Sequence, residues 1–291
     1  MSWNHPVQHQ LNREFLSDTD PSERLTMQVI QAKHGVQVSY DCFGQGPIVV
    51  LVHGSFSDQR SNWETIQPFL EDDFQLVAMS RRGRGMTTAT QGHSVVDEAS
   101  DLVCLLEALQ CPVSVVGHSY GAVVALLAAQ QKPQMLRSLI LYEPPRPGII
   151  APDKMRRLEN LAAADRWSEF AFEFFRDTLS VPCSELQPLK GTGIWRDILA
   201  DAANTLQDFR ALQKWAPLAE DFSQLDVPTT LQIGTESVAD LYWTTQLKRV
   251  LPDCRIQPIA GQAHEAMLTS PQQYSKLLRQ ALSANHQLTN R

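Results

Sequence analysis

Short runs rich in β-branched residues alternate with segments of helical period along most of this 291-residue chain. Pro47–Val52, Phe74–Met79 and Pro112–Val116 are the first three such runs, and their unbroken apolar character is typical of strands buried on both faces. Leu25–Lys33 and Val36–Phe43 precede them and alternate apolar with polar residues, which predicts a hairpin. Strands that alternate with helices indicate a mainly parallel sheet with crossover helices on both faces.

The alternation stops after the sixth predicted strand and resumes at Thr229–Ile233. The sequence between them contains only helical patterns, at Lys154–Ala164, Trp167–Leu179, Trp195–Gln207 and Phe209–Trp215. We therefore predict an α/β fold with a mostly parallel, eight-stranded sheet flanked by helices and a helical cap (residues 144–226) inserted after strand six. Residues 26–143 and 227–291 form the core in this interpretation, and residues 1–25 form an N-terminal arm.

Composition narrows the possible classes of protein. Apolar residues make up 43% of the chain and charged residues 20%, which is a globular balance. The net charge of −7, with no basic run beyond Arg81–Arg84, argues against a nucleic-acid partner. The longest apolar run, Ala122–Ala129, is shorter than the roughly 20 residues that cross a bilayer, and the first 25 residues lack the apolar core of a signal peptide. The five cysteines are odd in number and scattered, which indicates reduced thiols, so we expect a cytoplasmic protein. They show no CxxC or clustered Cys/His spacing, so we expect no zinc site.

The segment Gly117-His118-Ser119-Tyr120-Gly121 lies between a β-branched strand and an apolar helix. A sharp strand-to-helix turn brings backbones close together, so a Cβ at either glycine position would clash. The central serine is then held in a strained conformation with its hydroxyl exposed, at a helix N-terminus that favours negative charge. The sequence therefore predicts Ser119 as a nucleophile.

A serine nucleophile needs a base and donors for the oxyanion. His264 directly follows the last predicted strand, and the carboxyl ends of parallel strands meet at one edge of the sheet. His53-Gly54 follows the first buried strand, where the glycine allows a turn that leaves the Ser55 amide pointing inward. We expect His264 as the base, the amides of Ser55 and Tyr120 as the oxyanion hole, and His53 as a structural residue.

Taken together, the motifs Val52-His53-Gly54, Gly117–Gly121 and Gly261-Gln262-Ala263-His264 resemble the α/β-hydrolase fold superfamily over roughly residues 26–284. The segment Arg81-Arg82-Gly83-Arg84-Gly85 is similar to a stretch after the fourth strand of many members, with Ser80 in place of the usual Asp. The resemblance implies that residues 144–226 are the cap of this superfamily. A serine nucleophile argues against haloalkane dehalogenases and epoxide hydrolases, which use an aspartate.

The acid of the implied triad has three candidates. Many relatives place an Asp three residues after the glycine that ends the seventh strand, where this chain has Ser237. A sub-group places it two residues after that glycine, which favours Glu236. Asp240 lies further along the same loop, and Glu143 ends strand six, where some relatives carry their acid. We expect Glu236, with Asp240 and Glu143 as alternatives; Glu143 otherwise anchors the hinge to the cap.

The sequence thus predicts a serine hydrolase that cleaves a small, partly apolar carboxylic ester, thioester or lactone through an acyl-enzyme. No metal or organic cofactor is implied, and the expected partner is a small-molecule substrate; the oligomeric state is left open. Two alternatives use the same triad: carbon–carbon bond hydrolysis, and cofactor-free perhydrolysis resembling bacterial non-haem haloperoxidases, which typically lack so large a cap. A non-catalytic ligand-binding protein is the third. We interpret Arg81, Arg82 and Arg84 as a solvated or loop-anchoring cluster, and Trp167, Trp195 and Trp215 as cap core.

Overall fold

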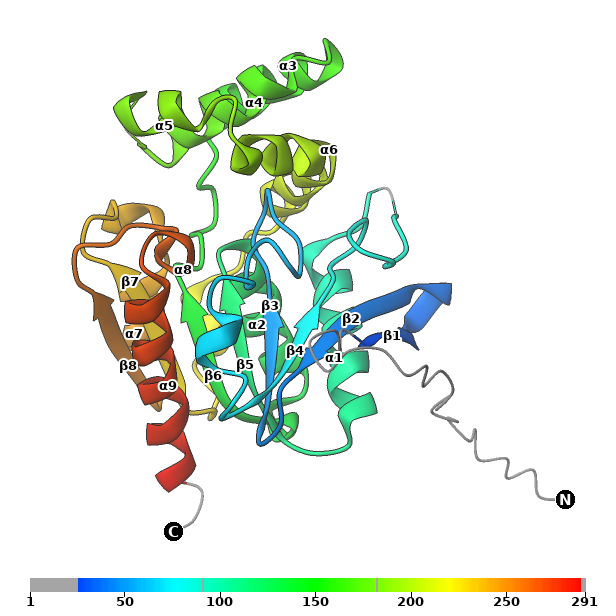
Figure 1. Cartoon of the computed structure of the whole chain (residues 1–291), viewed down its shortest axis with the longest axis vertical. Coiled ribbons are helices and arrows are strands. Elements are labelled where there is room, and N and C mark those ends of the chain that lie inside the picture. The colour runs from blue at the N-terminus through cyan, green and yellow to red at the C-terminus, as the bar shows by residue number, and fades with distance from the viewer. Residues whose placement is uncertain (1–25, 91, 182, 289–291) are drawn as a thin grey trace, which may run out of the picture.

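The computed structural model describes residues 26–288 except 91 and 182, so the predicted arm at residues 1–25 lies outside the described residues. Its centre is one eight-stranded sheet with the order β1-β2-β4-β3-β5-β6-β7-β8 (Figure 1). The strands are β1 Thr26–Gln31, β2 Gln37–Phe43, β3 Ile48–Val52, β4 Gln75–Met79, β5 Val113–His118, β6 Leu136–Tyr142, β7 Thr229–Gly234 and β8 Cys254–Ile259. Strand β2 is antiparallel to both β1 and β4, and β3 to β8 are parallel. The predicted hairpin and the mostly parallel sheet are both confirmed.

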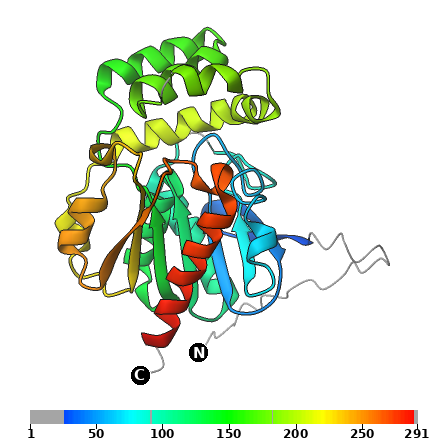
Figure 2. The same cartoon turned by 60° about the vertical axis from the view of Figure 1, so that its left-hand side comes forward.

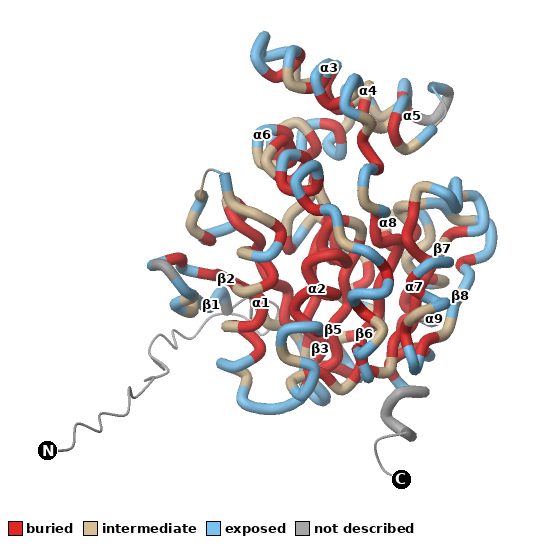
Figure 3. Tube along the Cα trace, turned by 180° about the vertical axis from the view of Figure 1, so that it is seen from behind, coloured by how far each residue is buried: buried red, intermediate tan, exposed pale blue. Residues whose placement is uncertain are grey.

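Helices cover both faces of the sheet, as the apolar runs predict (Figure 2). The core helices are α1 Val95–Leu109, α2 Tyr120–Gln131, α7 Thr244–Val250, α8 Ala266–Thr269 and α9 Pro271–Leu288. Val50 and Val52 pack into one apolar cluster with α1, α2 and α7, while Val49 and Leu51 pack into another with α9. Residues Tyr120–Ala129 of α2 are all buried, so this helix lies at the centre of the molecule (Figure 3). Among the described residues, no helix combines the length and apolar character needed to cross a membrane.

Between β6 and β7 the chain forms helices that lie above the carboxyl edge of the sheet (Figures 1 and 2). They are α3 Pro152–Ala163, α4 Trp167–Glu173, a π-helical turn Phe174–Thr178, α5 Cys183–Leu189 and α6 Gly193–Lys214. Their apolar faces form a cluster of their own, which includes Phe170, Trp195 and Phe209 and reaches down to Phe56 of the core. Helix α6 is the lowest of them and lies between the rest of the cap and the sheet (Figure 2).

One helix prediction is wrong in detail. Trp195–Gln207 and Phe209–Trp215 are one continuous helix, α6, because Asp208 between them is buried and paired with arginines instead of ending the helix. The segment from Trp63 to Leu70 also has apolar residues at helical spacing, but it forms only turns and a short 3₁₀ segment, Gln67–Phe69. Pro68 lies inside that segment and supplies no backbone N–H, which disfavours a regular α-helix there.

Candidate active site

Ser119 lies at a sharp turn between β5 and α2, as its flanking pattern predicts. Its backbone φ is +53° and ψ is −121°, a strained conformation for a residue other than glycine. The two flanking glycines permit this turn. A Cβ on Gly117 would lie 2.6 Å from the Cα of Ala122, and one on Gly121 would lie 2.3 Å from the carbonyl oxygen of Val52. The turn leaves Ser119 half-buried and facing the pocket described below.

His264 follows β8, and its Nδ1 lies 2.5 Å from Oε2 of Glu143. Glu143 directly follows β6, is fully buried and has a φ of +48°. Its other oxygen, Oε1, accepts a hydrogen bond of 2.8 Å from the Gly234 amide at the end of β7. The ring of Tyr242 stacks on that of His264, with centroids 5.2 Å apart and planes at 14°. Strands β6, β7 and β8 therefore fix the carboxylate and the imidazole together.

The expected pairing of Glu236 with His264 is corrected: the residue at His264 is Glu143. Glu236 is exposed, and its carboxylate accepts a hydrogen bond from the neighbouring Thr235 hydroxyl. Asp240 is also exposed, and its carbonyl accepts a hydrogen bond from Arg146. The turn after Gly234 is tied by the Glu236 amide to the carbonyl of Gln262, which directs this loop outward rather than over the imidazole. The end of strand six was the signal that identified Glu143 as an alternative.

Negative charge and burial shift the pKa of His264 in opposite directions. Burial lowers its pKa, but the hydrogen bond and negative charge of Glu143 outweigh burial and leave the pKa raised above 6.5. Next to it, burial raises the pKa of Glu265 to about 7. His118 lies on the other side: its Nε2 donates to the His264 carbonyl oxygen at 2.9 Å, and burial holds its pKa well below the ordinary value. His118 is therefore neutral and supports the His264 backbone, a role that sequence reasoning missed.

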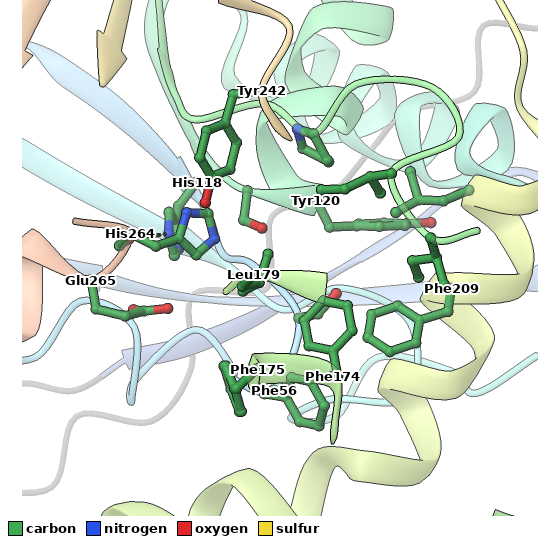
Figure 4. A pocket seen from close by; sticks show the side chains of 16 residues that line it. Phe56, His118, Tyr120, Phe174, Phe175, Leu179, Phe209, Tyr242, His264 and Glu265 are labelled. Atoms are coloured by element: carbon green, nitrogen blue, oxygen red, sulfur yellow. Dashed lines mark hydrogen bonds between the residues drawn. The ribbon is translucent and has the colours of Figure 1, made fainter. Parts of the chain in front are cut away.

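The pocket between core and cap is lined largely by apolar side chains (Figure 4). Ser119, His264 and Glu265 line it from the core. Its apolar lining comprises Phe56, Tyr120, Pro145, Ile149, Ile150, Phe174, Phe175, Leu179, Phe209, Leu212 and Tyr242. The three tryptophans of the cap do not line the pocket. Trp167 and Trp195 pack in the apolar cluster of the cap, whereas Trp215 packs in the core cluster, against Trp243. The pocket accordingly offers a mainly aromatic surface beside a few reactive groups.

Ser55 and Tyr120, the predicted oxyanion donors, both line this pocket. The Gly54 carbonyl oxygen, on the same peptide as the Ser55 amide, accepts hydrogen bonds from Arg81 Nη2 and His53 Nδ1, each at 2.8 Å. His53 is fully buried and also accepts the Arg81 amide at Nε2, so it is the structural residue that the sequence predicts.

The arginines after β4 are buried, not solvated, and they anchor loops. Arg81 pairs with Glu98 of α1 and Asp208 of α6, and its guanidinium lies 4.3 Å from the centre of the Tyr120 ring. Arg84 binds Asp201 and Asp208 of α6. Arg82 binds Asp101 of α1. The three arginines thus pair with two carboxylates of core helix α1 and two carboxylates of cap helix α6.

Within the part of the chain that the structure describes, two groups of side chains have donor atoms within 4.8 Å of one another, close enough to hold a metal ion. They are His118, His264 and Glu265, and His93, Glu98 and Asp208. In both groups protein partners already engage the donors: Nε2 of His118 binds a carbonyl, and Glu98 and Asp208 bind Arg81. Neither group is arranged as an open metal site.

A family model described as "Alpha/beta hydrolase family" matches residues 49–277. Among curated proteins, pyrrolizixenacetamide deacetylase of Xenorhabdus hominickii is 36% identical over 107 residues, which are 36% of this chain and 40% of the deacetylase. The pimeloyl-[acyl-carrier protein] methyl ester esterase of Methylococcus capsulatus is 35% identical over 121 residues, which are 39% of this chain and 46% of that esterase. The chain thus matches less than half the length of either relative.

Among solved structures, an alpha/beta hydrolase of Sphaerobacter thermophilus superposes with a TM-score of 0.75 at 26% identity. The superposition covers 87% of this chain and 99% of that protein. The family match spans most of the chain, and strands β4 to β8, the serine turn and the His264 loop lie within it. The chain belongs to the alpha/beta hydrolase family.

Proposed function

We propose that this protein is a serine hydrolase that cleaves a small, partly apolar carboxylic ester through an acyl-enzyme, with Ser119 as nucleophile, His264 as base and Glu143 as its orienting acid. The observation that carries the proposal is the 2.5 Å contact between His264 Nδ1 and Glu143 Oε2. A proton held on Nδ1 by this carboxylate leaves the lone pair of Nε2 to accept the serine proton.

The reaction follows from these placements. Ser119 Oγ attacks the ester carbonyl carbon while its proton moves to Nε2 of His264, and the carbonyl oxygen becomes an oxyanion. The amides of Ser55 and Tyr120 donate to that oxyanion. When the tetrahedral intermediate collapses, the bond to the alcohol breaks and His264 gives its proton to the leaving oxygen. Water, deprotonated by His264, then attacks the acyl-enzyme. When this second intermediate collapses, the bond to Ser119 Oγ breaks, His264 returns the proton to that oxygen, and the acid is released.

The pocket lining supports an apolar acyl or alcohol group. Phe56 of the core and Phe174, Phe175 and Phe209 of the cap form one side of the pocket, with ring centroids of Phe56 to the others between 5.0 and 5.9 Å. Such a lining stabilises hydrocarbon by removing it from water. Two relatives, a deacetylase and a methyl ester esterase, remove acyl or alkyl groups by their names. Thioesters and lactones present the same electrophilic carbonyl to Ser119 and remain within the proposal.

Fluorophosphonate labelling and a panel of p-nitrophenyl esters from acetate to octanoate test the proposal. The wild-type protein is expected to be labelled at one serine and to hydrolyse at least one ester of the panel. Ser119→Ala is expected to prevent labelling and to reduce kcat by at least about a thousandfold, as for other triads. A Ser119→Ala protein that keeps more than about a tenth of wild-type activity overturns Ser119 as nucleophile, since that loss corresponds to under about 1.4 kcal/mol.

A further inference from the structure

The carbonyl group of Gly54 belongs to the same peptide as the Ser55 amide and determines its orientation. A trans peptide is planar, and its C=O and N–H point in opposite directions; the described residues contain no cis peptide. The Gly54 oxygen accepts hydrogen bonds from Arg81 Nη2 and His53 Nδ1, both at 2.8 Å, and neither residue lines the pocket. The Ser55 N–H therefore points away from Arg81 and His53. Ser119 lies next to this peptide, since its Cβ would be only 3.2 Å from a Cβ on Gly54.

Helix α6 of the cap holds the next two residues of the same loop. Asp208 Oδ2 accepts a hydrogen bond of 2.8 Å from the Ser55 hydroxyl, and Thr205 Oγ1 accepts one of 2.7 Å from the Phe56 amide. Thr205 and Asp208 are three residues apart, so they lie on one face of the helix. Asp208 also pairs with Arg81, the donor to the Gly54 oxygen. One face of a cap helix thus contacts the oxyanion loop at each of its three residues, directly or through Arg81.

The loop needs this external support because its backbone is strained. Phe56 has a φ of +57°, a region that a bulky residue rarely adopts and that persists only when surrounding contacts enforce it. The Thr205 hydroxyl holds the Phe56 amide, and the rings of Phe170, Phe174 and Phe209 from the cap pack around its side chain. All of these contacts come from residues 144–226, far from the loop in sequence.

We propose that Thr205 and Asp208 are positioning residues for the oxyanion hole, which makes the cap part of the apparatus that stabilises the transition state and not only a wall of the substrate pocket. This inference rests on the proposed function, since it assigns a task within ester hydrolysis. Neither residue touches substrate. Both act through the Gly54–Phe56 loop.

Thr205→Val is the main test, because valine keeps the shape of threonine and removes the acceptor for the Phe56 amide together with the donor to Asp201. Asn204 also donates to Asp201, so a variant at that position controls for the loss of a hydrogen bond to Asp201. Thr205→Ser is the rescue variant, and Asn204→Ala is the matched control: Asn204 lies on the same helix and donates to the Gly83 carbonyl, away from the oxyanion loop. For p-nitrophenyl acetate, Thr205→Val is expected to lower kcat about tenfold with KM within about twofold, because an oxyanion contact exists only in the transition state. The affinity for phenylboronic acid, which forms a tetrahedral adduct on serine, is expected to fall by a similar factor.

Thr205→Ser and Asn204→Ala are expected to stay within about threefold of the wild type in kcat and in boronate affinity. A folded Thr205→Val protein with unchanged kcat and boronate affinity, or an Asn204→Ala protein with an equal loss, overturns the inference. If Thr205→Val does not fold, Ser55→Ala decides: it removes only the hydroxyl bonded to Asp208 and keeps the amide, and the same kcat-specific loss is expected. A wild-type protein that neither hydrolyses esters nor reacts with fluorophosphonate instead refutes the proposed function, so the two failures are distinguishable.

Discussion

At the scale of single residues, three of the six non-glycine residues with positive φ in the described part of the chain belong to the candidate site or lie beside it. Ser119, Glu143 and Phe56 have φ values of +53°, +48° and +57°, and each lies in or beside the candidate site. Such conformations cost about 1–3 kcal/mol each and persist where surrounding contacts enforce them. For Glu143 the enforcing contact is the Gly234 amide on Oε1, which turns Oε2 toward His264.

That contact gives Glu143→Gln a defined outcome. The Gly234 amide needs an acceptor, so the glutamine oxygen takes the place of Oε1 and its NH₂ group faces His264 Nδ1. The imidazole must then accept at Nδ1 and carry its proton on Nε2, the tautomer that cannot take the proton of Ser119. We expect kcat/KM for p-nitrophenyl acetate to fall at least about a hundredfold.

Glu236→Gln and Asp240→Asn are the matched controls, because both side chains are exposed carboxylates on the loop where the sequence predicted the acid. Each is expected to stay within about twofold of the wild type. A loss in Glu236→Gln comparable with that in Glu143→Gln contradicts the assignment of Glu143.

The pH dependence of the reaction provides a separate test of the same pair. His264 acts as a base only when neutral, and its raised pKa places the acid limb of kcat/KM above pH 6.5. In Glu143→Gln the raising contribution is lost while burial, which lowers the pKa, remains, so the acid limb of the residual activity is expected to move to lower pH. Profiles of kcat/KM from pH 5 to 9 measure the acid limb of the wild type and that of Glu143→Gln. An unchanged limb in Glu143→Gln, or an equal shift in Glu236→Gln, contradicts this prediction.

Single residues also mark where sequence reasoning stops. The glycines around Ser119 and the position of His264 after the last strand are local patterns, and they were sufficient to predict that both residues lie at the same edge of the sheet, where they line one pocket. The choice between Glu143 and Glu236 depends on which of two neighbouring strand ends faces the imidazole. That depends on the path of the loop after Gly234, which is fixed by a hydrogen bond between Glu236 and Gln262, 26 residues apart in the chain.

At the scale of elements, helix α6 joins the cap to the core through buried charge. Asp201 and Asp208 on its lower face bind Arg81 and Arg84, and these side chains are almost entirely excluded from solvent. The sequence predicted two helices on either side of Asp208, whereas the structure has one, and the buried pairing of Asp208 with Arg81 and Arg84 explains why this residue is tolerated in the helix interior. Removing the cap would leave Arg84 without a carboxylate partner and Arg81 with Glu98 alone, which is destabilising.

Phe175 tests the cap as a determinant of acyl preference. It lies half-buried in the pocket lining, with its ring centroid 5.0 Å from that of Phe56. Phe175→Ala opens space in the pocket that longer acyl chains can fill, so the ratio of kcat/KM for octanoate to that for acetate is expected to rise about tenfold. Phe172→Ala is the control, because Phe172 belongs to the same cap region but packs against Arg176 and Lys190 outside the pocket. An unchanged ratio in Phe175→Ala, or an equal rise in Phe172→Ala, contradicts a substrate-gating cap.

At the scale of the whole molecule, the sheet and the cap differ in how far the sequence determines them. Continuous apolar strands and helical periods are repeated local signals, and they predicted the sheet and the crossover helices. The cap has no such alternation, and its arrangement depends on long-range contacts such as Phe56 with Phe209 and Arg84 with Asp201. The same long-range contacts join the cap to the candidate site, so the parts hardest to predict from the sequence are those that link the cap to the core.

The free energy of unfolding depends on pH through buried titratable side chains. His53 and His118 are fully buried, and their pKa values lie well below 6.5, through burial and then Arg81 for His53, and through burial and then His264 for His118. Below pH 6.5 each of these two histidines binds a proton in the unfolded chain but not in the folded chain. The free energy of unfolding therefore decreases as the pH is lowered, by up to roughly 1.4 kcal/mol per pH unit for each histidine. His264 and His93 have raised pKa values, and their stabilising contribution is already complete below 6.5, so they add no slope there.

Glu265 opposes this loss. Its pKa of about 7 in the folded chain, against roughly 4.3 in the unfolded chain, means that the folded state binds the extra proton, and stability rises as pH falls through this range. Two protons favour unfolding and one favours folding, so the free energy of unfolding is expected to drop by about 1 kcal/mol between pH 6.5 and 5.5. Urea titrations at both pH values measure the drop, and Glu265→Gln is expected to make it about twice as steep, because only the two histidines then remain. A wild-type stability that is constant or higher at pH 5.5 contradicts the buried neutral state of His53 and His118.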